Sequence, residues 1–190
     1  MTRNRPARHY LLPALIVAAS AGFLAGCATS RPSGNANVPD PAKPVDLARY
    51  LGRWYEIGRY EASFEAGCEG VTADYSMRDD GLIRVVNTCR EGSPNGKLRA
   101  AEAKAKIVPD SNNAKLKVSF FGPFYVGDYW VLDHGDDYEW SIVGEGSGKY
   151  LWLLSRAPVL DREKQNALVD RARQLGYDTS RIRYTQQPPG

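Results

Sequence analysis

Apolar and polar side chains alternate along most of the chain between residues 53 and 156. In the segment 115–121, for example, Leu116, Val118 and Phe120 alternate with polar neighbours. A period of two is typical of a β-strand with one buried face. The pattern predicts eight strands, at 53–60, 68–77, 82–90, 98–108, 115–121, 125–133, 138–143 and 150–156.

Polar turns separate these segments, and Asp79-Asp80-Gly81 is the strongest turn signal among them. Consecutive strands joined in this way predict an antiparallel up-and-down sheet. A sheet of that size tends to close, because closure removes its exposed edges. We therefore expect an all-β fold, an eight-stranded antiparallel up-and-down barrel, which is wide enough to hold one small ligand.

One C-terminal helix is expected after the barrel. Asp161 is a good N-cap and Gly176 a natural stop. Between them Leu168, Ala172 and Leu175 recur at helical spacing. A short final strand at 181–186 is expected to pair with the first strand of the barrel.

The first 26 residues have the order of a secretory signal. Arg3, Arg5 and Arg8 precede an apolar run at 11–23, and small residues then lead to Cys27. The run is too short to span a bilayer comfortably. We predict that residues 1–26 are a signal peptide.

Leu24-Ala25-Gly26-Cys27 resembles the lipobox of bacterial lipoproteins. The resemblance implies cleavage before Cys27 and lipidation of its thiol. Because Ala28 follows rather than Asp, it also implies the outer membrane. A soluble exported protein and an uncleaved N-terminal anchor are the alternatives.

The segment that follows is rich in Pro, Ser, Asn and Gly. Such a composition cannot bury enough apolar surface to fold. We predict that residues 27–44 are a flexible tether carrying the lipidated Cys27, and that 45–187 form the folded domain. A helical turn at 45–51 is expected to close one end of that domain.

The charge and the histidine content of the chain argue against several classes of function. The chain has 25 Lys and Arg against 22 Asp and Glu, and loss of Arg3, Arg5 and Arg8 with the signal leaves 22 of each. The mature chain therefore lacks the basic excess of a nucleic-acid binder. His134 is then its sole histidine, which argues against a His-based metal site, a haem carrier or a Ser-His-Asp triad. No metal or other cofactor is expected.

Cys68 and Cys89 lie on consecutive predicted strands that flank the turn at 79–81. Export to an oxidising compartment favours a disulfide between them. The alternatives are two free buried thiols or a catalytic Cys68.

Up-and-down topology assigns the ends of the barrel. Trp54 begins the first strand and Arg156 ends the eighth, so both fall at the same end, the base. The connections at 61–67, 91–97, 121–125 and 144–149 then lie at the opposite end, the mouth.

Four stretches together resemble the lipocalin family, and within it the bacterial outer-membrane lipoprotein lipocalins. They are Gly52-Arg53-Trp54-Tyr55-Glu56, the segments 117–124 and 127–131, and Leu153-Leu154-Ser155-Arg156. The resemblance implies that Arg156 stacks on Trp54 to close the base. It also implies a protein that is not an enzyme. Such a protein binds and stores or transports hydrophobic small molecules, namely fatty acids or lysophospholipids, in envelope maintenance.

Aromatic residues are the candidate ligand contacts, some inside the barrel and some at its mouth. They are Tyr60, Phe64, Tyr75, Phe120, Phe124, Tyr129, Tyr138, Trp140 and Trp152. A filled core with no cavity is the alternative. Rival functions are a lipocalin-fold, isomerase-like enzyme using Cys68 or an interior carboxylate such as Glu56, and an envelope scaffold without a ligand. The periplasmic face of the membrane is the expected location. The sequence leaves open whether the protein forms a homodimer.

Overall fold

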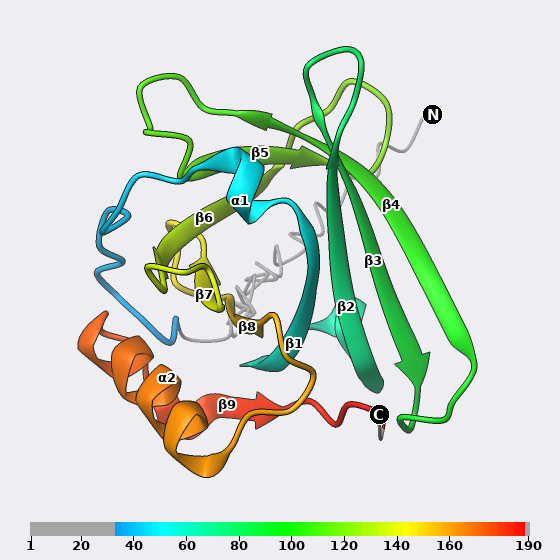
Figure 1. Cartoon of the computed structure of the whole chain (residues 1–190), viewed down its shortest axis with the longest axis vertical. Coiled ribbons are helices and arrows are strands. Elements are labelled where there is room, and N and C mark those ends of the chain that lie inside the picture. The colour runs from blue at the N-terminus through cyan, green and yellow to red at the C-terminus, as the bar shows by residue number, and fades with distance from the viewer. Residues whose placement is uncertain (1–32, 189–190) are drawn as a thin grey trace, which may run out of the picture. The chain divides into compact units, whose positions relative to one another are not determined.

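The computed structural model of the protein describes residues 33–188 (Figure 1). The expected signal at 1–26 and the lipidation site Cys27 lie outside these residues. The elements, in chain order, are α1 (Leu47–Tyr50), β1 (Gly52–Tyr60), the 3₁₀ turn η1 (Ser63–Glu65), β2 (Cys68–Met77), β3 (Ile83–Glu91), β4 (Leu98–Ile107), β5 (Lys115–Ser119), β6 (Gly127–His134), β7 (Trp140–Gly144), β8 (Leu151–Ser155), α2 (Arg162–Gln174), the 3₁₀ turn η2 (Thr179–Arg181) and β9 (Ile182–Tyr184).

The first eight strands form a closed antiparallel barrel. Each strand from β2 to β8 pairs with the next, β8 pairs with β1, and β1 pairs with β2. The expected all-β fold, an eight-stranded up-and-down barrel with one C-terminal helix, is therefore confirmed.

The C-terminal strand β9 pairs with β1 beyond the residues at which β1 pairs with β2. Residues 52–55 of β1 pair with β2, whereas residues 58–60 pair with β9, as expected for the final strand. The chain beyond β9 then runs beside β2, where Gly70 N–H donates to the Gln186 carbonyl at 2.7 Å. Residues 58–59 of β1 are thus paired with a strand on both sides, β8 and β9.

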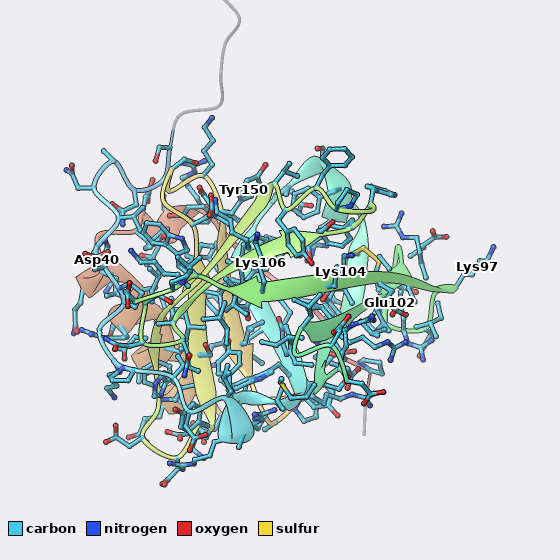
Figure 2. The ribbon with its side chains drawn as sticks, turned by 90° about the horizontal axis from the view of Figure 1, so that it is seen from above. Asp40, Lys97, Glu102, Lys104, Lys106 and Tyr150 are labelled. Atoms are coloured by element: carbon cyan, nitrogen blue, oxygen red, sulfur yellow. A yellow bond between two sulfur atoms is a disulfide. The ribbon has the colours of Figure 1, made fainter. Side chains whose placement is uncertain are left out.

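The Ala-rich strand β4 alternates between buried and exposed residues. Ala103 and Ala105 are buried, whereas Glu102 and Lys106 are exposed. Figure 2 labels Glu102, Lys104 and Lys106 along this strand. A period of two is the signature of a strand, so the segment forms part of the barrel wall rather than a helix.

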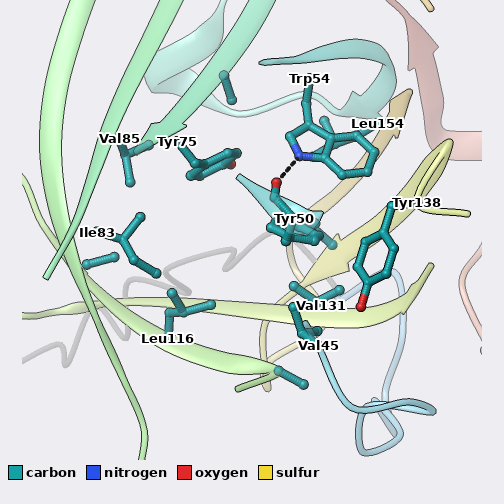
Figure 3. Close-up of a cluster of buried hydrophobic side chains, with 14 of the residues drawn as sticks. Val45, Tyr50, Trp54, Tyr75, Ile83, Val85, Leu116, Val131, Tyr138 and Leu154 are labelled. Atoms are coloured by element: carbon teal, nitrogen blue, oxygen red, sulfur yellow. Dashed lines mark hydrogen bonds between the residues drawn. The ribbon is translucent and has the colours of Figure 1, made fainter. Parts of the chain in front are cut away.

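The base of the barrel is closed by α1 and a packed apolar cluster (Figure 3). Trp54 Nε1–H donates to the Tyr50 carbonyl at 2.9 Å, and the two rings lie 5.1 Å apart. The Arg156 guanidinium lies 3.8 Å from the centre of the Trp54 ring. Gly52, the first residue of β1, has φ +92°, a left-handed conformation that glycine adopts without strain.

The helix α2 covers one outer side of the barrel (Figure 1). The Asp161 side chain accepts the Lys164 N–H at 2.8 Å and caps the helix start. Leu168, Val169 and Ala172 are buried against strand residues that include Ile142. Within residues 33–188 no helix has both the length and the apolar character needed to cross a membrane.

The structure corrects the expected extent of the tether. Residues 33–44 lie against the barrel, held by Gly34 N–H to the Gly148 carbonyl at 2.9 Å and Ala42 N–H to the Leu132 carbonyl at 2.8 Å. Asn35 is buried and its Nδ2 donates to the Leu175 carbonyl at 2.9 Å. Composition pointed to disorder because this segment has few apolar side chains, but backbone hydrogen bonds hold it in place.

The described sheet pairings, core clusters and disulfide lie within residues 33–188. This part of the chain therefore has a closed sheet and a hydrophobic core of its own. We expect it to fold independently of the preceding residues.

Candidate functional site

A cavity of about 490 Å³ lies inside the barrel. Its walls are mainly apolar: Val71, Ala73, Ile83, Val85, Ala105, Leu116, Val118, Val131 and Leu154. Ligand pockets usually measure about 300–1,000 Å³ and are lined mostly by hydrophobic and aromatic side chains. The size and lining both suit a small hydrophobic molecule.

Five of the nine candidate ligand contacts line this cavity. They are Phe64, Tyr75, Phe120, Tyr129 and Trp152. They come from η1, β2, the β5–β6 connection, β6 and β8. Sequence segments far apart along the chain thus converge on one space.

Tyr60 and Trp140 do not line the cavity but belong to the apolar cluster that packs against α2. The Tyr60 hydroxyl donates to the Asp178 carbonyl at 2.9 Å, and its ring packs against Tyr177 at 5.8 Å. Trp140 packs against the apolar cluster beneath α2. The parity expected for these two residues was wrong.

Tyr138 and Phe124 also lie away from the cavity. Tyr138 has φ +58° in the turn before β7, so the strand begins later than its sequence suggests. Its ring stacks on His134 at 4.3 Å, and its hydroxyl oxygen accepts the Asp46 N–H at 2.7 Å. Phe124 follows the turn at Gly122 and is 70% exposed.

A β-bulge in β1 explains part of this misassignment. Glu56 is opposite Leu154 and Gly58 is opposite Leu153, so Ile57 is the extra residue. Beyond the bulge, Arg59 is opposite Trp152, which lines the cavity. The side-chain alternation has therefore reversed by the end of the strand.

Because of the bulge, Glu56 and Arg59 point to the same side of β1. Arg59 Nη1 donates to Glu56 Oε1 at 2.6 Å and to Thr185 Oγ1 at 3.1 Å. Its Nη2 donates to the carbonyls of Glu65 and Cys68 at 3.0 and 3.3 Å. The Arg59 side chain is fully buried. Sequence reasoning missed this residue, although the isolated Gly58 within a strand was a signal for a bulge.

Burial sets the titration of Glu56. It raises the pKa of the Glu56 carboxyl above its usual value, and the Arg59 guanidinium opposes that shift. The pair is buried, and removing one partner would leave the other charge uncompensated. Glu56 is therefore held in an ion pair and is a poor candidate for a catalytic base.

Deeper in the barrel, hydroxyl groups form a hydrogen-bonded chain. The Tyr75 hydroxyl donates to that of Tyr129 at 2.9 Å, which bonds the Tyr50 hydroxyl at 2.9 Å. The Tyr50 hydroxyl also bonds Ser141 Oγ at 3.0 Å. Burial raises the pKa of Tyr50 to about 12 and raises those of Tyr75 and Tyr129 as well, so all three stay neutral at physiological pH.

At the mouth, the Glu65 side chain is hydrogen-bonded to Trp152 of β8. Trp152 Nε1–H donates to Glu65 Oε2 at 2.9 Å, and Trp152 stacks on Tyr150, with ring centres 5.7 Å apart. The Phe64 ring lies 5.6 Å from that of Tyr150. Burial, followed by the nearby Glu56 charge, raises the pKa of Glu65 to about 7.

The chain is similar in sequence and fold to known proteins. Residues 45–187 match the family model for a lipocalin-like domain. The chain belongs to the lipocalin family. It is 41% identical over 159 residues to "Outer membrane lipoprotein Blc" of Vibrio cholerae, covering 82% of this chain and 92% of that protein. It is also 41% identical over 180 residues to the protein of that name in Escherichia coli K12, covering 94% and 98%.

Solved lipocalin structures agree on the fold. Insecticyanin from the tobacco hornworm Manduca sexta superposes with a TM-score of 0.63 at 24% identity, covering 81% of this chain and 88% of that one. At this identity the likeness concerns the fold alone. The fold and family expected from the motifs of this lipocalin are confirmed.

The two cysteines of the lipocalin domain form a disulfide between the start of β2 and the end of β3. Cys68 therefore has no free thiol that could act as a nucleophile. Among residues 33–188 no three His, Cys, Asp or Glu side chains are grouped as ligands for a metal ion.

Proposed function

We propose that this lipocalin binds single-chain lipids, fatty acids or lysophospholipids, in its barrel and stores or transports them. The apolar cavity of about 490 Å³, with Phe64 and Phe120 at its edge, carries the proposal. Burial of an acyl chain gives about 0.8 kcal/mol per CH₂. A chain of about twelve CH₂ groups thus supplies roughly 10 kcal/mol, enough to offset much of the estimated 4–15 kcal/mol cost of association.

We also propose that the protein is lipid-anchored at Cys27 in the outer membrane, on its periplasmic side, and serves envelope maintenance. The lipobox-like Leu24-Ala25-Gly26-Cys27 supports the anchor. The relatives named as outer membrane lipoproteins, which align over most of the chain, support the location. Radiolabelled palmitate incorporation that depends on Cys27, followed by membrane fractionation, tests this proposal.

Filling the cavity tests the lipid-binding proposal. Ala105 lines the cavity and is buried, so Ala105→Phe would occupy the space of an acyl chain. We expect fatty-acid affinity to fall by at least about tenfold, the loss expected when two or more CH₂ groups are no longer buried. Ala100→Phe, at an exposed position of the same strand, is the matched control and should bind as wild type does. Equal binding by both variants would place the lipid outside the cavity and overturn the proposal.

A catalytic function has less structural support. Cys68 is in a disulfide, and the Glu56 carboxylate is paired with the buried Arg59. The candidate nucleophile and the candidate base are thus both engaged in contacts within the protein.

A further inference from the structure

The polar groups at the cavity mouth are unevenly arranged. Glu56 and Glu65 both line the cavity, whereas the nearest cation, Arg59, does not. The Arg59 Nη atoms donate to protein acceptors on Glu56, Glu61, Glu65, Cys68 and Thr185. The charge presented to a bound molecule is therefore acidic, because the buried Arg59 is surrounded by its protein acceptors and does not line the cavity.

Within residues 33–188, four acidic residues line the cavity, namely Glu56, Glu65, Asp128 and Glu145, and Glu65 lies on the β1–β2 connection at the mouth. It ends η1, directly after Phe64, whose side chain is 58% exposed. The Glu65 side chain is 18% exposed, so it is accessible from the mouth yet largely desolvated. Trp152 donates to Oε2, and within the described part of the chain no hydrogen-bond donor reaches Oε1. One oxygen thus remains available as an acceptor at the entrance of an apolar cavity.

We propose that Glu65 is the head-group site of the cavity and selects single-chain lipids whose head carries a hydrogen-bond donor, a hydroxyl or an ammonium group. This inference rests on the proposed lipid-binding function. The acyl chain lies among Ile83, Val85 and Leu116, and the head remains at the mouth. A fatty acid still binds through its acyl chain but more weakly, because its carboxylate meets the negative charge of Glu65, whereas an ammonium or a glycerol hydroxyl donates to the free oxygen of Glu65.

The proposal makes head-group selection depend on pH. The groups around Glu65 are Arg59 and Glu56 of β1, Glu61 beyond that strand and Tyr75 of β2, with the neutral Trp152 indole on β8. Arg59 and Tyr75 keep their charge states between pH 5.5 and 8. Burial raises the pKa of Glu65 to about 7, so it gains its charge within this range.

The test compares ligands with one tail and three heads. Dodecylammonium, monolauroylglycerol and dodecanoate are titrated into residues 28–190, freed of lipid by solvent extraction, with intrinsic tryptophan fluorescence as the signal. At pH 8 we expect dodecylammonium to bind about tenfold more tightly than dodecanoate, the size expected of one hydrogen bond to a charged group. The glycerol ester, whose head is uncharged but donates hydroxyl groups, should lie between them.

The Glu65→Gln variant isolates the carboxylate. It should bind dodecylammonium and dodecanoate with similar affinity at pH 8. In the wild type, dodecylammonium binding should strengthen from pH 5.5 to pH 8, whereas the variant should show no such change. The amine is charged at both pH values, so this difference reports the ionisation of Glu65.

Glu61→Gln is the matched control, because Glu61 also pairs with Arg59 but does not line the cavity. It should keep the wild-type preference. Equal binding of all three heads by the wild type, or the same loss in Glu61→Gln, would overturn the role of Glu65 and leave lipid binding intact. Binding of none of the three would overturn the proposed function itself.

Discussion

The Arg156 guanidinium stacks on the Trp54 ring and at the same time donates to backbone carbonyls at the end of α1. Its Nη2 lies 2.7, 3.0 and 2.9 Å from the carbonyl oxygens of Arg49, Tyr50 and Leu51. The two residues are 102 positions apart in sequence, and their contact joins the last barrel strand to the first. One side chain thereby fixes α1 across the base.

We expect Arg156→Ala to destabilise the fold by about 2–3 kcal/mol, since several carbonyls lose a charged donor. Urea unfolding followed by far-UV circular dichroism measures the change. Arg53→Ala is the control, because its exposed ion pair with Asp74 should contribute less than about 1 kcal/mol. Similar losses in both variants would contradict the assigned role of Arg156.

Reduction of the Cys68–Cys89 disulfide should also destabilise the domain. The bridge joins residues 21 positions apart, and the loop-entropy relation gives a contribution of about 3 kcal/mol for such a loop. The double variant Cys68→Ala/Cys89→Ala should show this loss in urea unfolding. Because neither cysteine lines the cavity, its fatty-acid affinity under folding conditions should match that of the wild type. A large loss of affinity would contradict this separation of stability from binding.

The buried position of Glu65 predicts a pH-dependent stability. Its pKa is about 7 in the folded protein and about 4.5 when solvent-exposed, so the folded state holds the proton more tightly between these values. The free energy of unfolding should therefore fall as the pH rises from 5 to 7.5, and Glu56 acts with the same sign.

Urea midpoints at pH 5.5 and 8 measure this effect, with Glu65→Gln as the comparison. From pH 5.5 to pH 8, the urea midpoint of the wild type should decrease more than that of Glu65→Gln. The exposed carboxylates with lowered pKa values, such as Asp80 and Glu102, titrate below this window and should not contribute. An identical decrease in both proteins would show that Glu65 does not titrate in this range.

Removing the hydroxyl of Tyr129 should destabilise the fold, because it breaks the interior chain of hydrogen-bonded hydroxyls. Tyr129→Phe removes the shared partner of Tyr50 and Tyr75. We expect a loss of about 1–3 kcal/mol, because two buried hydroxyls lose a hydrogen bond. Tyr125→Phe on the outer side, where the ring lies near the Lys106 ammonium, should be neutral. Thermal unfolding of the two variants provides the comparison.

Sequence pattern was sufficient for the barrel because most strands alternate with a period of two and are bounded by clear turns. It also brought Trp54 and Arg156 to one end, since up-and-down topology leaves little choice. Local backbone irregularities could not be read in this way. The bulge at Ile57 reverses the side-chain parity that had placed Tyr60 inside, and the positive φ of Tyr138 delays β7.

Composition misled at residues 33–44 for a different reason. A polar segment can be ordered by hydrogen bonds to backbone carbonyls of a finished barrel, as Gly34 and Ala42 are. Those carbonyls are brought into position only after the rest of the chain has folded, so local composition carries little information about them. The same limit applies to Arg59, whose Nη1 donates to Thr185 Oγ1 at the far end of the chain.

Native mass spectrometry of residues 28–190, secreted to the periplasm and purified without detergent, tests the central claim most directly. Solvent extraction of the same sample identifies any molecule that it carries. The account predicts one fatty acid or lysophospholipid per barrel, lost in the Ala105→Phe variant. A ligand-free mass that stays unchanged when fatty acid and lysophospholipid are added would contradict it.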